Sequence, residues 1–329
     1  MLFAHVMPWF SRSEKELGWH WRMNRSSEEV LSSGQVASHY RPLIGPYDSS
    51  DESAVRLQVA WMKRAGFDGV LADWYGINDH FDYADIHSRT QKLFEECTRQ
   101  GLKIGIVYED QSIGNAIRQG KLPSDAKGAE AEKVGRWLVT HWLKRPNWFR
   151  FNGKPTILVF GPQAFAAHEW AQFRRATGDI SLISLHERRA PANGVFDWPI
   201  PDRGIGFQEQ FPSRVKESET HIAVAYPRFR DYYEEGGQKG YAEIADAEGE
   251  TLRRTLDLAR ASGAQAIQVA TWNDWQEGTQ VEPSVELRFR DLITIQNFRR
   301  QIDPTFPYKA ADLQHPLDEF LRTRKNGTG

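Results

Sequence analysis

Near its C-terminus the chain reads Ala264-Gln265-Ala266-Ile267-Gln268-Val269-Ala270-Thr271-Trp272-Asn273-Asp274-Trp275-Gln276-Glu277-Gly278-Thr279-Gln280-Val281-Glu282-Pro283. Residues 264–269 have the β-branched, alternating character of a strand. The strand ends in two tryptophans, two carboxylates three residues apart and a glycine turn. Indole rings beside paired carboxyl groups are typical of sites that cleave glycosidic bonds. A solvated polar turn would account equally well for this stretch alone.

The rest of the chain alternates apolar runs with amphipathic segments. Together with 264–269, we expect strands at 2–9, 67–76, 102–111, 154–160, 180–187, 195–198 and 221–227. Helices are expected at about 51–66, 86–100, 127–144, 163–176, 249–262 and 286–301. Nearly continuous apolar strands alternating with helices indicate a parallel sheet covered by helices. Eight such units favour an α/β fold of the (β/α)8 TIM-barrel type, and no glycine-rich phosphate loop follows the first strand to favour a nucleotide-binding sheet.

The segments between these units indicate the domain organisation. No Pro- or Ser-rich linker divides the sequence, so we expect residues 1–329 to form a single barrel domain. A polar-aromatic segment at about 11–49 lacks periodicity and is expected to be a long loop, which in a compact domain is usually functional. A second irregular stretch is expected at about 188–248.

Composition narrows the classes of partner. A net charge of -2 gives no reason to expect a nucleic acid or an anionic membrane as partner. No apolar run approaches the roughly 20 residues of a membrane span. As written, the chain is expected to be cytoplasmic, whereas removal of a leader would place it in the periplasm or outside the cell. The oligomeric state is not indicated.

A cofactor is not expected either. Cys97, the single cysteine, lies in a helix-like stretch and is interpreted as a small buried hydrophobe. His5, His20 and His39 show no tight ligand spacing and no cysteine accompanies them, so neither a metal site nor another cofactor is predicted.

In a barrel of this type the C-terminal ends of the strands meet at one mouth, where active sites lie. Polar and aromatic side chains at these ends are Asp73, Trp74, Tyr75, Tyr108, Glu109, Asp110, Gln111, His186, Glu187, Asp197, Trp198, Tyr226, Asn273, Asp274 and Glu277. Their convergence favours a carbohydrate site. Adjacent strand residues point to opposite sides, so at most one of Glu109 and Asp110 is expected to face the mouth.

Each of these residues also has a structural interpretation. Asp73 is equally suited to capping the following loop, and Asn273 to fixing a turn through side-chain to backbone bonds. For His186 and Glu187, a hydrogen-bonded structural pair is favoured over catalysis.

Three segments resemble one family. Residues 272–282 resemble the Trp-Asn-Glu-Trp-x-Glu-Gly-Thr-Gln-Ile-Glu signature of glycoside hydrolase family 99, the endo-α-mannosidases and endomannanases. Tyr40-Arg41-Pro42-Leu43-Ile44-Gly45-Pro46-Tyr47-Asp48-Ser49 is similar to that family's Tyr-Pro-x-Leu-Gly-Pro-Tyr-Ser loop, and Tyr108-Glu109-Asp110 stands at the place of its His-Ile-Glu-Pro-Tyr strand end. Position 274 is Asp where family 99 has Glu. In this the chain resembles family 71, the α-1,3-glucanases, so it is identified as a 71/99-like sequence.

The resemblance implies roles for these residues. Glu277 matches the general acid/base, and Asp274 matches the residue that acts on the sugar 2-hydroxyl to give a 1,2-anhydro sugar with retention. Glu109 matches a carboxylate that binds substrate near the same hydroxyl. The implied reaction is hydrolysis of an α-mannoside or α-glucoside without a cofactor.

An acid and base pair requires one carboxyl group to be protonated and the other to be ionised. Glu277 must keep its proton near neutrality, which burial against Trp272 or Trp275 would achieve, while Asp274 must ionise. Other expected substrate contacts are Trp272, Asn273, Trp275, Asp73, Trp74, Tyr75, Tyr108, Tyr47, Tyr226 and His186. Because Asp274 is shorter than Glu, a non-catalytic glycan-binding barrel or a module serving polysaccharide assembly stands as the alternative. A metal-dependent hydrolase is the least favoured hypothesis.

Overall fold

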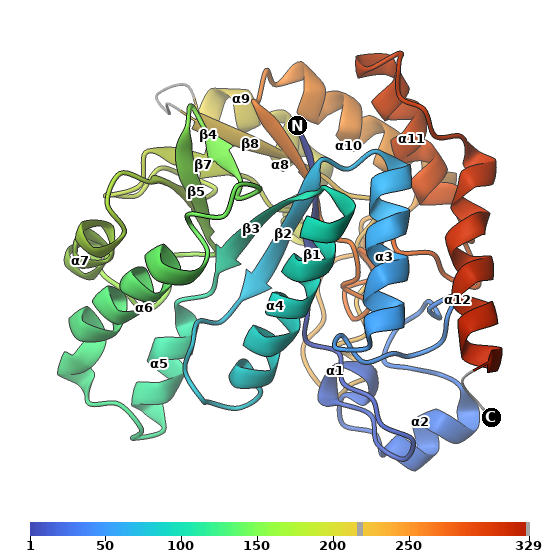
Figure 1. Cartoon of the computed structure of the whole chain (residues 1–329), viewed down its shortest axis with the longest axis horizontal. Coiled ribbons are helices and arrows are strands. Elements are labelled where there is room, and N and C mark those ends of the chain that lie inside the picture. The colour runs from blue at the N-terminus through green and yellow to red at the C-terminus, as the bar shows by residue number, and fades with distance from the viewer. Residues whose placement is uncertain (216–219, 327–329) are drawn as a thin grey trace.

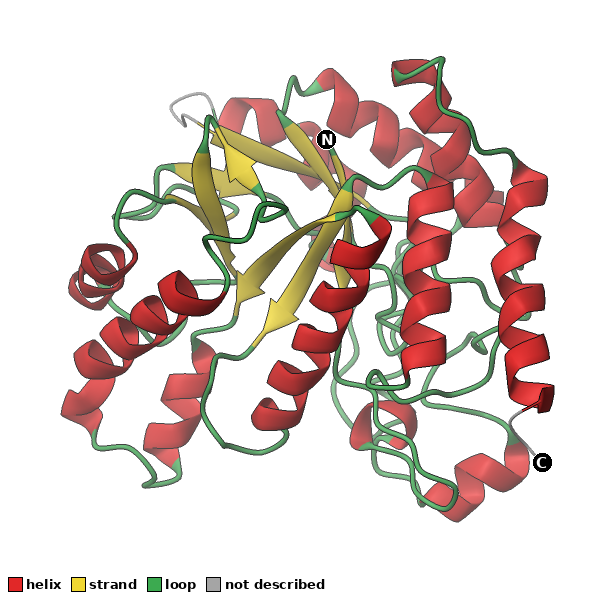
Figure 2. Ribbon diagram, in the orientation of Figure 1, coloured by secondary structure: helices red, strands yellow, loops and turns green. Residues whose placement is uncertain are grey.

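Eight parallel strands close into a barrel with the helices wound around it (Figures 1 and 2). The computed structural model describes residues 1–215 and 220–326. The barrel strands are β1 (Leu2–Val6), β2 (Gly69–Trp74), β3 (Lys103–Tyr108), β5 (Lys154–Val159), β6 (Ser181–Leu185), β7 (Gly194–Phe196), β8 (Thr220–Ala225) and β9 (Ala266–Val269). β9 pairs with β1 and β3 pairs with β5, which closes the ring, while β4 (Arg150–Phe151) adds a short antiparallel hairpin to β5. The predicted (β/α)8 barrel is confirmed, and each predicted strand overlaps one barrel strand.

The six predicted helices are also present. They are α3 (Glu52–Ala65), α4 (Tyr83–Gln100), α6 (Lys127–His141), α7 (Ala167–Thr177), α10 (Glu250–Ala261) and α11 (Arg290–Ile302). Side-chain caps and glycines set the ends of these helices, as α3 illustrates. The Asp51 carboxylate caps α3 by accepting from the amides of Ser53 and Ala54, and Gly66 ends it in the left-handed conformation that glycine adopts without strain.

Several elements were not predicted from the sequence. Residues 11–49, expected to be a loop, contain α1 (Trp19–Arg22) and α2 (Ser27–Ser33); Ser26 caps α2 and Gly34 ends it. The stretch 188–248, of which residues 216–219 lie outside the described residues, contains α8 (Gly204–Glu209) and α9 (Phe211–Arg214). The others are α5 (Gln111–Arg118), α12 (Gln314–Asn326) and the 3-10 turns η1 (Ser124–Ala126), η2 (Pro201–Arg203), η3 (Ala247–Gly249) and η4 (Ala310–Leu313).

The buried side chains of the barrel strands include a polar contact between β1 and β9. His5 of β1 lies 3.2 Å from the side-chain oxygen of Gln268 of β9, and its ring meets that of Trp198 edge-on at 4.6 Å. Burial lowers the pKa of His5 to about 4, so the imidazole is neutral and suits this interior. No helix among the described residues has the length and apolar character needed to cross a membrane.

Candidate active site

The segment after β9 forms a closed turn that carries both candidate acids. The Thr271 amide donates to the Thr279 carbonyl at 3.0 Å, and the hydroxyl oxygens of the two threonines lie 3.0 Å apart. Inside the turn, the Asp274 amide donates to the Thr271 hydroxyl at 2.7 Å and the Glu277 amide donates to Oδ1 of Asp274 at 3.1 Å. These bonds fix the spacing of the two carboxyl groups.

Asn273 ties the turn to the end of β1. Its Oδ1 accepts from the Met7 amide at 2.7 Å, and its Nδ2 donates to the Met7 carbonyl at 3.0 Å and to the Tyr47 hydroxyl at 3.1 Å. All of these groups are buried. Asn273 therefore has the turn-fixing role that its residue type suggested.

A third carboxyl group, Glu282, supports the turn from beneath. Tyr47 and Trp275 donate to its Oε2 at 2.7 and 3.1 Å, and Gln58 donates to its Oε1 at 2.9 Å. Burial raises the pKa of Glu282 to about 8, and these three donors act in the opposite direction. Tyr47 and Trp275, expected to contact substrate, are thus both engaged with this buried carboxyl.

The segment after β8 holds the turn from the other side. The amides of Arg230 and Tyr232 donate to the carbonyls of Glu277 and Gln276 at 2.9 and 2.8 Å. The Tyr233 hydroxyl donates to Oε1 of Glu277 at 3.2 Å. Gly278 has a φ of +67°, and a Cβ there would lie 2.4 Å from the Arg230 carbonyl oxygen, so the close approach of the two segments requires glycine.

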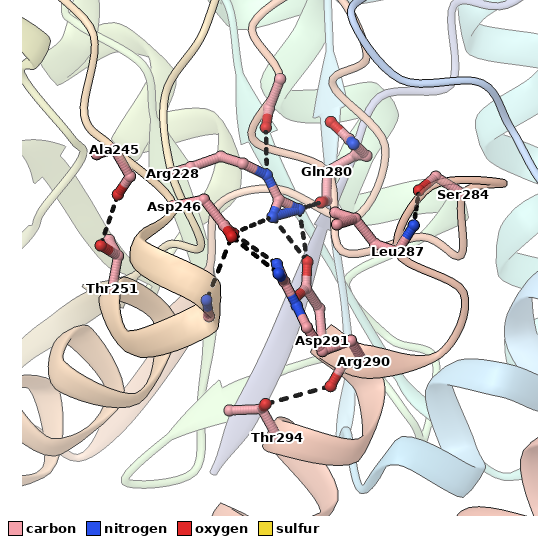
Figure 3. A network of polar contacts seen from close by, with 12 residues as sticks. Arg228, Ala245, Asp246, Thr251, Gln280, Ser284, Leu287, Arg290, Asp291 and Thr294 are labelled. Atoms are coloured by element: carbon pink, nitrogen blue, oxygen red, sulfur yellow. Dashed lines mark hydrogen bonds and ion pairs between the residues drawn. The ribbon is translucent and has the colours of Figure 1, made fainter.

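Arg228 anchors the far end of the turn (Figure 3). Its guanidinium is buried and donates to the carbonyls of Gly278 and Gln280 at 3.1 and 2.8 Å. Asp246 and Asp291 accept from the same group at 3.0 and 2.9 Å. The planar fork of Arg can bind several acceptors at once, and here it joins the turn to the starts of η3 and α11.

Four carboxyl groups from three strand ends interact electrostatically at the mouth. They are Asp73 at the end of β2, Glu109 after β3, and Asp274 and Glu277 after β9. Burial raises the pKa of Glu277 well above its ordinary value and Asp274 raises it further. Burial also raises the pKa of Asp274, to about 7, against the opposing effect of the Glu277 and Gln276 amides. Asp274 therefore favours the protonated form of Glu277, whereas the backbone amides of Glu277 and Gln276 favour the ionised form of Asp274.

Burial raises the pKa of the other two carboxyl groups as well. Burial, with a contribution from Asp274, raises the pKa of Asp73 to about 8, while Tyr75 lowers it. Oδ1 of Asp73 is buried and has no hydrogen-bond partner among the described residues. Burial and Asp73 raise the pKa of Glu109, whose Oε2 accepts from Gln111 and Gln163 at 2.8 Å each.

A cleft of about 760 Å³ opens beside this cluster, within the roughly 300–1,000 Å³ typical of small-molecule sites. Its wall includes His20, Tyr75 and Gln111, and each of these is linked to the cluster. His20 bonds to the side chain of Gln276, Tyr75 adjoins Asp73, and Gln111 donates to Glu109. The cleft therefore adjoins the carboxyl groups at the barrel mouth.

The structure brings together Asp73, Tyr75, Glu109, Asp274 and Glu277, as the strand ends predicted. Glu109 and Asp110 diverge as expected. The Asp110 carboxylate accepts from the amides of Gln163, Ala164 and Phe165 at 2.8, 3.0 and 2.7 Å, and so it orders the loop after β5.

Trp74 and Tyr108 do not lie at the mouth, which corrects the expectation for both. Trp74 donates through its indole nitrogen to His87 of α4 at 3.1 Å, and the rings of Trp74 and Tyr108 are 5.3 Å apart. Tyr108 also packs against Phe173 of α7. Both side chains point from the sheet toward the helices, because each neighbours in sequence an inward-facing carboxylate.

Three further expected contacts lie away from the four carboxyl groups. Trp272 is wholly buried with its ring edge-on to Phe67. His186 pairs with Asp197 at 3.1 Å rather than with Glu187. Tyr226 is buried, and burial, with a contribution from Asp197, raises the pKa of its hydroxyl.

Sequence reasoning did not identify Tyr233, Arg228 or His20 as part of this site, whereas Gln111 was among the predicted strand-end residues. Arg228 and Tyr233 follow the strand β8, and a search extended a few residues beyond each strand end would have included them. His20 lies in the long loop, where no periodicity marks it. In the described part of the chain, no group of three or more His, Cys, Asp or Glu side chains is arranged to hold a metal ion.

Comparison with known proteins places this geometry in a known fold. No protein-family model matches the sequence, and no curated protein matches it. Among solved structures, the GH99 endo-α-mannosidase from Bacteroides thetaiotaomicron is similar over 94% of this chain and 98% of its own, with a TM-score of 0.70 and 16% identity. The chain shares the fold of that enzyme. A glycoside hydrolase-like protein is also similar, over 90% of this chain and 93% of its own, with a TM-score of 0.62 and 12% identity.

The likeness in fold agrees with the resemblance of the three sequence segments to family 99. At these identities it establishes the architecture alone. The function must therefore be argued from the residues at the mouth.

Proposed function

We propose that this protein is a glycoside hydrolase that cleaves α-linked glycans, either α-mannosides or α-glucosides, with Glu277 as general acid/base and Asp274 as base. The observation that carries the proposal is the pairing of these two buried carboxyl groups on one turn, in which the Glu277 amide donates to Asp274. The α configuration is supported by the likeness of the motif and of the fold to an endo-α-mannosidase.

For an α-mannoside, whose O2 lies on the face of the ring opposite the leaving oxygen, Glu277 protonates the glycosidic oxygen in the proposed reaction while Asp274 takes the proton of the sugar 2-hydroxyl. In an α-glucoside these two oxygens lie on the same face, so this route applies to the mannoside alone. O2 attacks C1 as the bond from C1 to the leaving oxygen breaks, which gives a 1,2-anhydro sugar. Glu277, now ionised, then removes a proton from water, which attacks C1. The C1–O2 bond breaks, O2 regains a proton from Asp274, and the configuration at C1 is retained overall.

Neighbouring groups suit these steps. The Tyr233 hydroxyl donates to Glu277 and stabilises the carboxylate that forms when the proton leaves. The backbone amides of Glu277 and Gln276 favour the ionised form of Asp274. Asp73 and Glu109 supply further carboxyl oxygens for the hydroxyls of the same sugar, and the free Oδ1 of Asp73 is available for this.

The test uses isosteric amides. Glu277→Gln keeps an acceptor for Tyr233 but has no proton to give, and Asp274→Asn cannot act as base. Each should lower kcat on a cleaved α-mannan or α-glucan by about 10²–10⁴-fold, the usual contribution of a general acid or base. Glu319→Gln, an exposed change on α12, is the matched control and should retain the wild-type rate. Wild-type rates in both amide variants would disprove the assignment.

A glycan-binding barrel without turnover is the second candidate, and the aromatic cleft is the observation that favours it. The cleft wall contains Trp9, Trp19, Tyr75, Phe81 and Tyr83. Isothermal titration with α-mannan and α-glucan oligosaccharides, beside product analysis, separates the two functions. Saturable binding with no product from the wild-type protein would favour the binding module.

A further inference from the structure

The cleft beside the carboxyl groups is walled in part by two stacked aromatic pairs. The rings of Trp9 and His20 are 4.3 Å apart at 8°, and those of Tyr75 and Tyr83 are 4.8 Å apart at 8°. All four residues line the cleft. They come from the segments after β1 and β2, so two neighbouring strand ends supply its wall.

His20 connects this wall to the catalytic turn. Its Nδ1 lies 3.0 Å from Oε1 of Gln276, the residue between Trp275 and Glu277. Its Nε2 lies 3.9 Å from Oδ2 of Asp82, another residue of the cleft wall. One ring nitrogen is therefore directed at the turn, and the other lies on the side of the cleft.

The protonation of His20 follows from its surroundings. Burial lowers the pKa of His20 to about 4, so the ring is neutral at ordinary pH and carries a single N–H. Because the partner of Nδ1 is an amide oxygen, Nδ1 carries the hydrogen and donates it. Nε2 then has a free lone pair, which is an acceptor for a hydroxyl group in the cleft.

We infer that the cleft is a subsite for an uncharged sugar residue next to the one being cleaved, and that His20 serves it in two ways. Its Nε2 accepts a hydrogen bond from a hydroxyl of that residue, and its Nδ1–H positions Gln276 and hence the turn that carries Glu277. This inference rests on the proposed function. It makes His20 both a substrate contact and a positioning residue.

The charges of the cleft select for an uncharged sugar. Asp82 and Asp85 line it, and the one cation among its lining residues, Arg89, has Asp48 3.5 Å from its Nε. A uronate carboxylate would therefore be repelled by Asp82 and Asp85, and Arg89, the cation that could oppose it, is already paired with Asp48. Neutral hydroxyls meet acceptors and aromatic faces instead.

Two variants separate the two roles of His20. The side-chain nitrogen of Asn can take the place of Nδ1, so His20→Asn keeps a donor for Gln276 and loses the cleft contact. The side chain of Gln reaches the place of Nε2, so His20→Gln keeps a group for the sugar and loses the bond to the turn. Both variants remove the ring that stacks on Trp9, so any effect of losing that stacking is the same in the two. His168→Gln, an exposed change on α7, is the control.

Kinetics are measured on neutral α-linked mannose and glucose oligosaccharides of two and four residues. With the cleaved tetrasaccharide, His20→Asn should raise KM about five- to tenfold, the loss expected for one hydrogen bond. His20→Gln should instead lower kcat by a similar factor with a smaller rise in KM. Equal changes in kcat and KM for the two variants, or none, would overturn the inference.

Binding supplies a second readout that does not depend on turnover or on a His20 variant. Protein carrying Glu277→Gln, with ¹⁵N-labelled histidine, is titrated with the neutral tetrasaccharides and with a tetragalacturonide. A neutral tetrasaccharide should shift the Nε2 resonance of His20, and the acidic one should bind at least tenfold more weakly. Binding without that shift, equal binding of the acidic glycan, or no binding at all would overturn the subsite. Hydrolysis by the wild-type protein, measured in parallel, decides separately whether the proposed function stands.

Discussion

The backbone amide of Glu277 donates to Oδ1 of Asp274 at 3.1 Å, so the proposed acid and the proposed base are joined by one hydrogen bond. This bond has opposite consequences for the two groups. The amide favours the ionised form of Asp274, while the nearby Asp274 carboxylate raises the pKa of Glu277. The turn therefore separates the pKa values of two carboxyl groups that are both buried and would otherwise titrate in the same pH range.

The first prediction concerns the pH dependence of hydrolysis. Activity needs Asp274 ionised and Glu277 protonated, so kcat/KM should rise as pH increases through about 7 and fall at a higher pH as Glu277 ionises. Because the two groups are coupled, the limbs report apparent pKa values of the pair. Initial rates between pH 4 and 10 check this, and a maximum below pH 5 would contradict it.

The second prediction concerns Tyr233. Its hydroxyl donates to Oε1 of Glu277 and holds the pKa of that group down. Tyr233→Phe should therefore move the alkaline limb of the profile to higher pH. It should also lower kcat about tenfold, because the carboxylate formed in the reaction loses a donor. Tyr241→Phe, which changes an exposed tyrosine of the same segment, should leave both unchanged. An unmoved alkaline limb in Tyr233→Phe would show that the bond does not act on Glu277.

The third prediction concerns the stability of the anchor behind the turn. Arg228→Met would remove one of the two cations that Asp246 and Asp291 share, leaving Arg290, and would leave the two buried carbonyls of the turn without their donor, so it should lower the free energy of unfolding by about 2–3 kcal/mol. Arg228→Lys keeps the charge but cannot bond both carbonyls of the turn, so it should cost less. Urea unfolding measures both changes.

The matched control for Arg228 is an exposed pair. Arg253→Met removes an ion pair with Glu250 on the surface of α10 and should cost less than about 1 kcal/mol. If Arg228→Met cost no more than this control, the network would not stabilise the turn.

The barrel could be predicted from the sequence because the local pattern of apolar residues identifies each strand. The segments around β2 and β3 are apolar, of strand length and bounded by helices, and parallel pairing with right-handed crossovers then leaves few topologies. The helices outside the eight units were missed because local pattern does not mark them. α1 has only four residues, and α12 is fixed mainly by packing of Leu317 and Phe320 in the core.

A residue of the site could be predicted from the sequence where its position on a strand decides which way its side chain points. Asp73 and Glu109 come from strand ends and reach the mouth, and the same rule, applied to alternate residues, sends Trp74 and Tyr108 to the helices. The contacts of His20 with Gln276 and of Tyr233 with Glu277 join residues 256 and 44 positions apart. Such contacts depend on how loops pack across the mouth, and no local pattern encodes them.

The last prediction uses Glu282 to test the pH dependence of stability. Folding raises its pKa from an ordinary 4.5 to about 8, so the folded protein holds a proton there that the unfolded chain releases. The stabilisation from this group is present below about pH 4.5 and is lost as pH rises through about 8. Glu282→Gln does not titrate, so its free energy of unfolding should fall less between pH 5 and 9 than that of the wild type. The difference should be on the order of 4 kcal/mol, because one pKa unit corresponds to about 1.4 kcal/mol.

Urea unfolding at pH 5, 7 and 9 measures this difference. Some decline should remain in Glu282→Gln, because Asp73 and Asp274 have pKa values raised in the same direction. Glu132→Gln, an exposed change on α6, should give a curve parallel to that of the wild type. A Glu282→Gln curve that is also parallel to the wild type would mean that the donors from Tyr47, Trp275 and Gln58 keep Glu282 ionised in the folded protein, and that burial does not decide its charge.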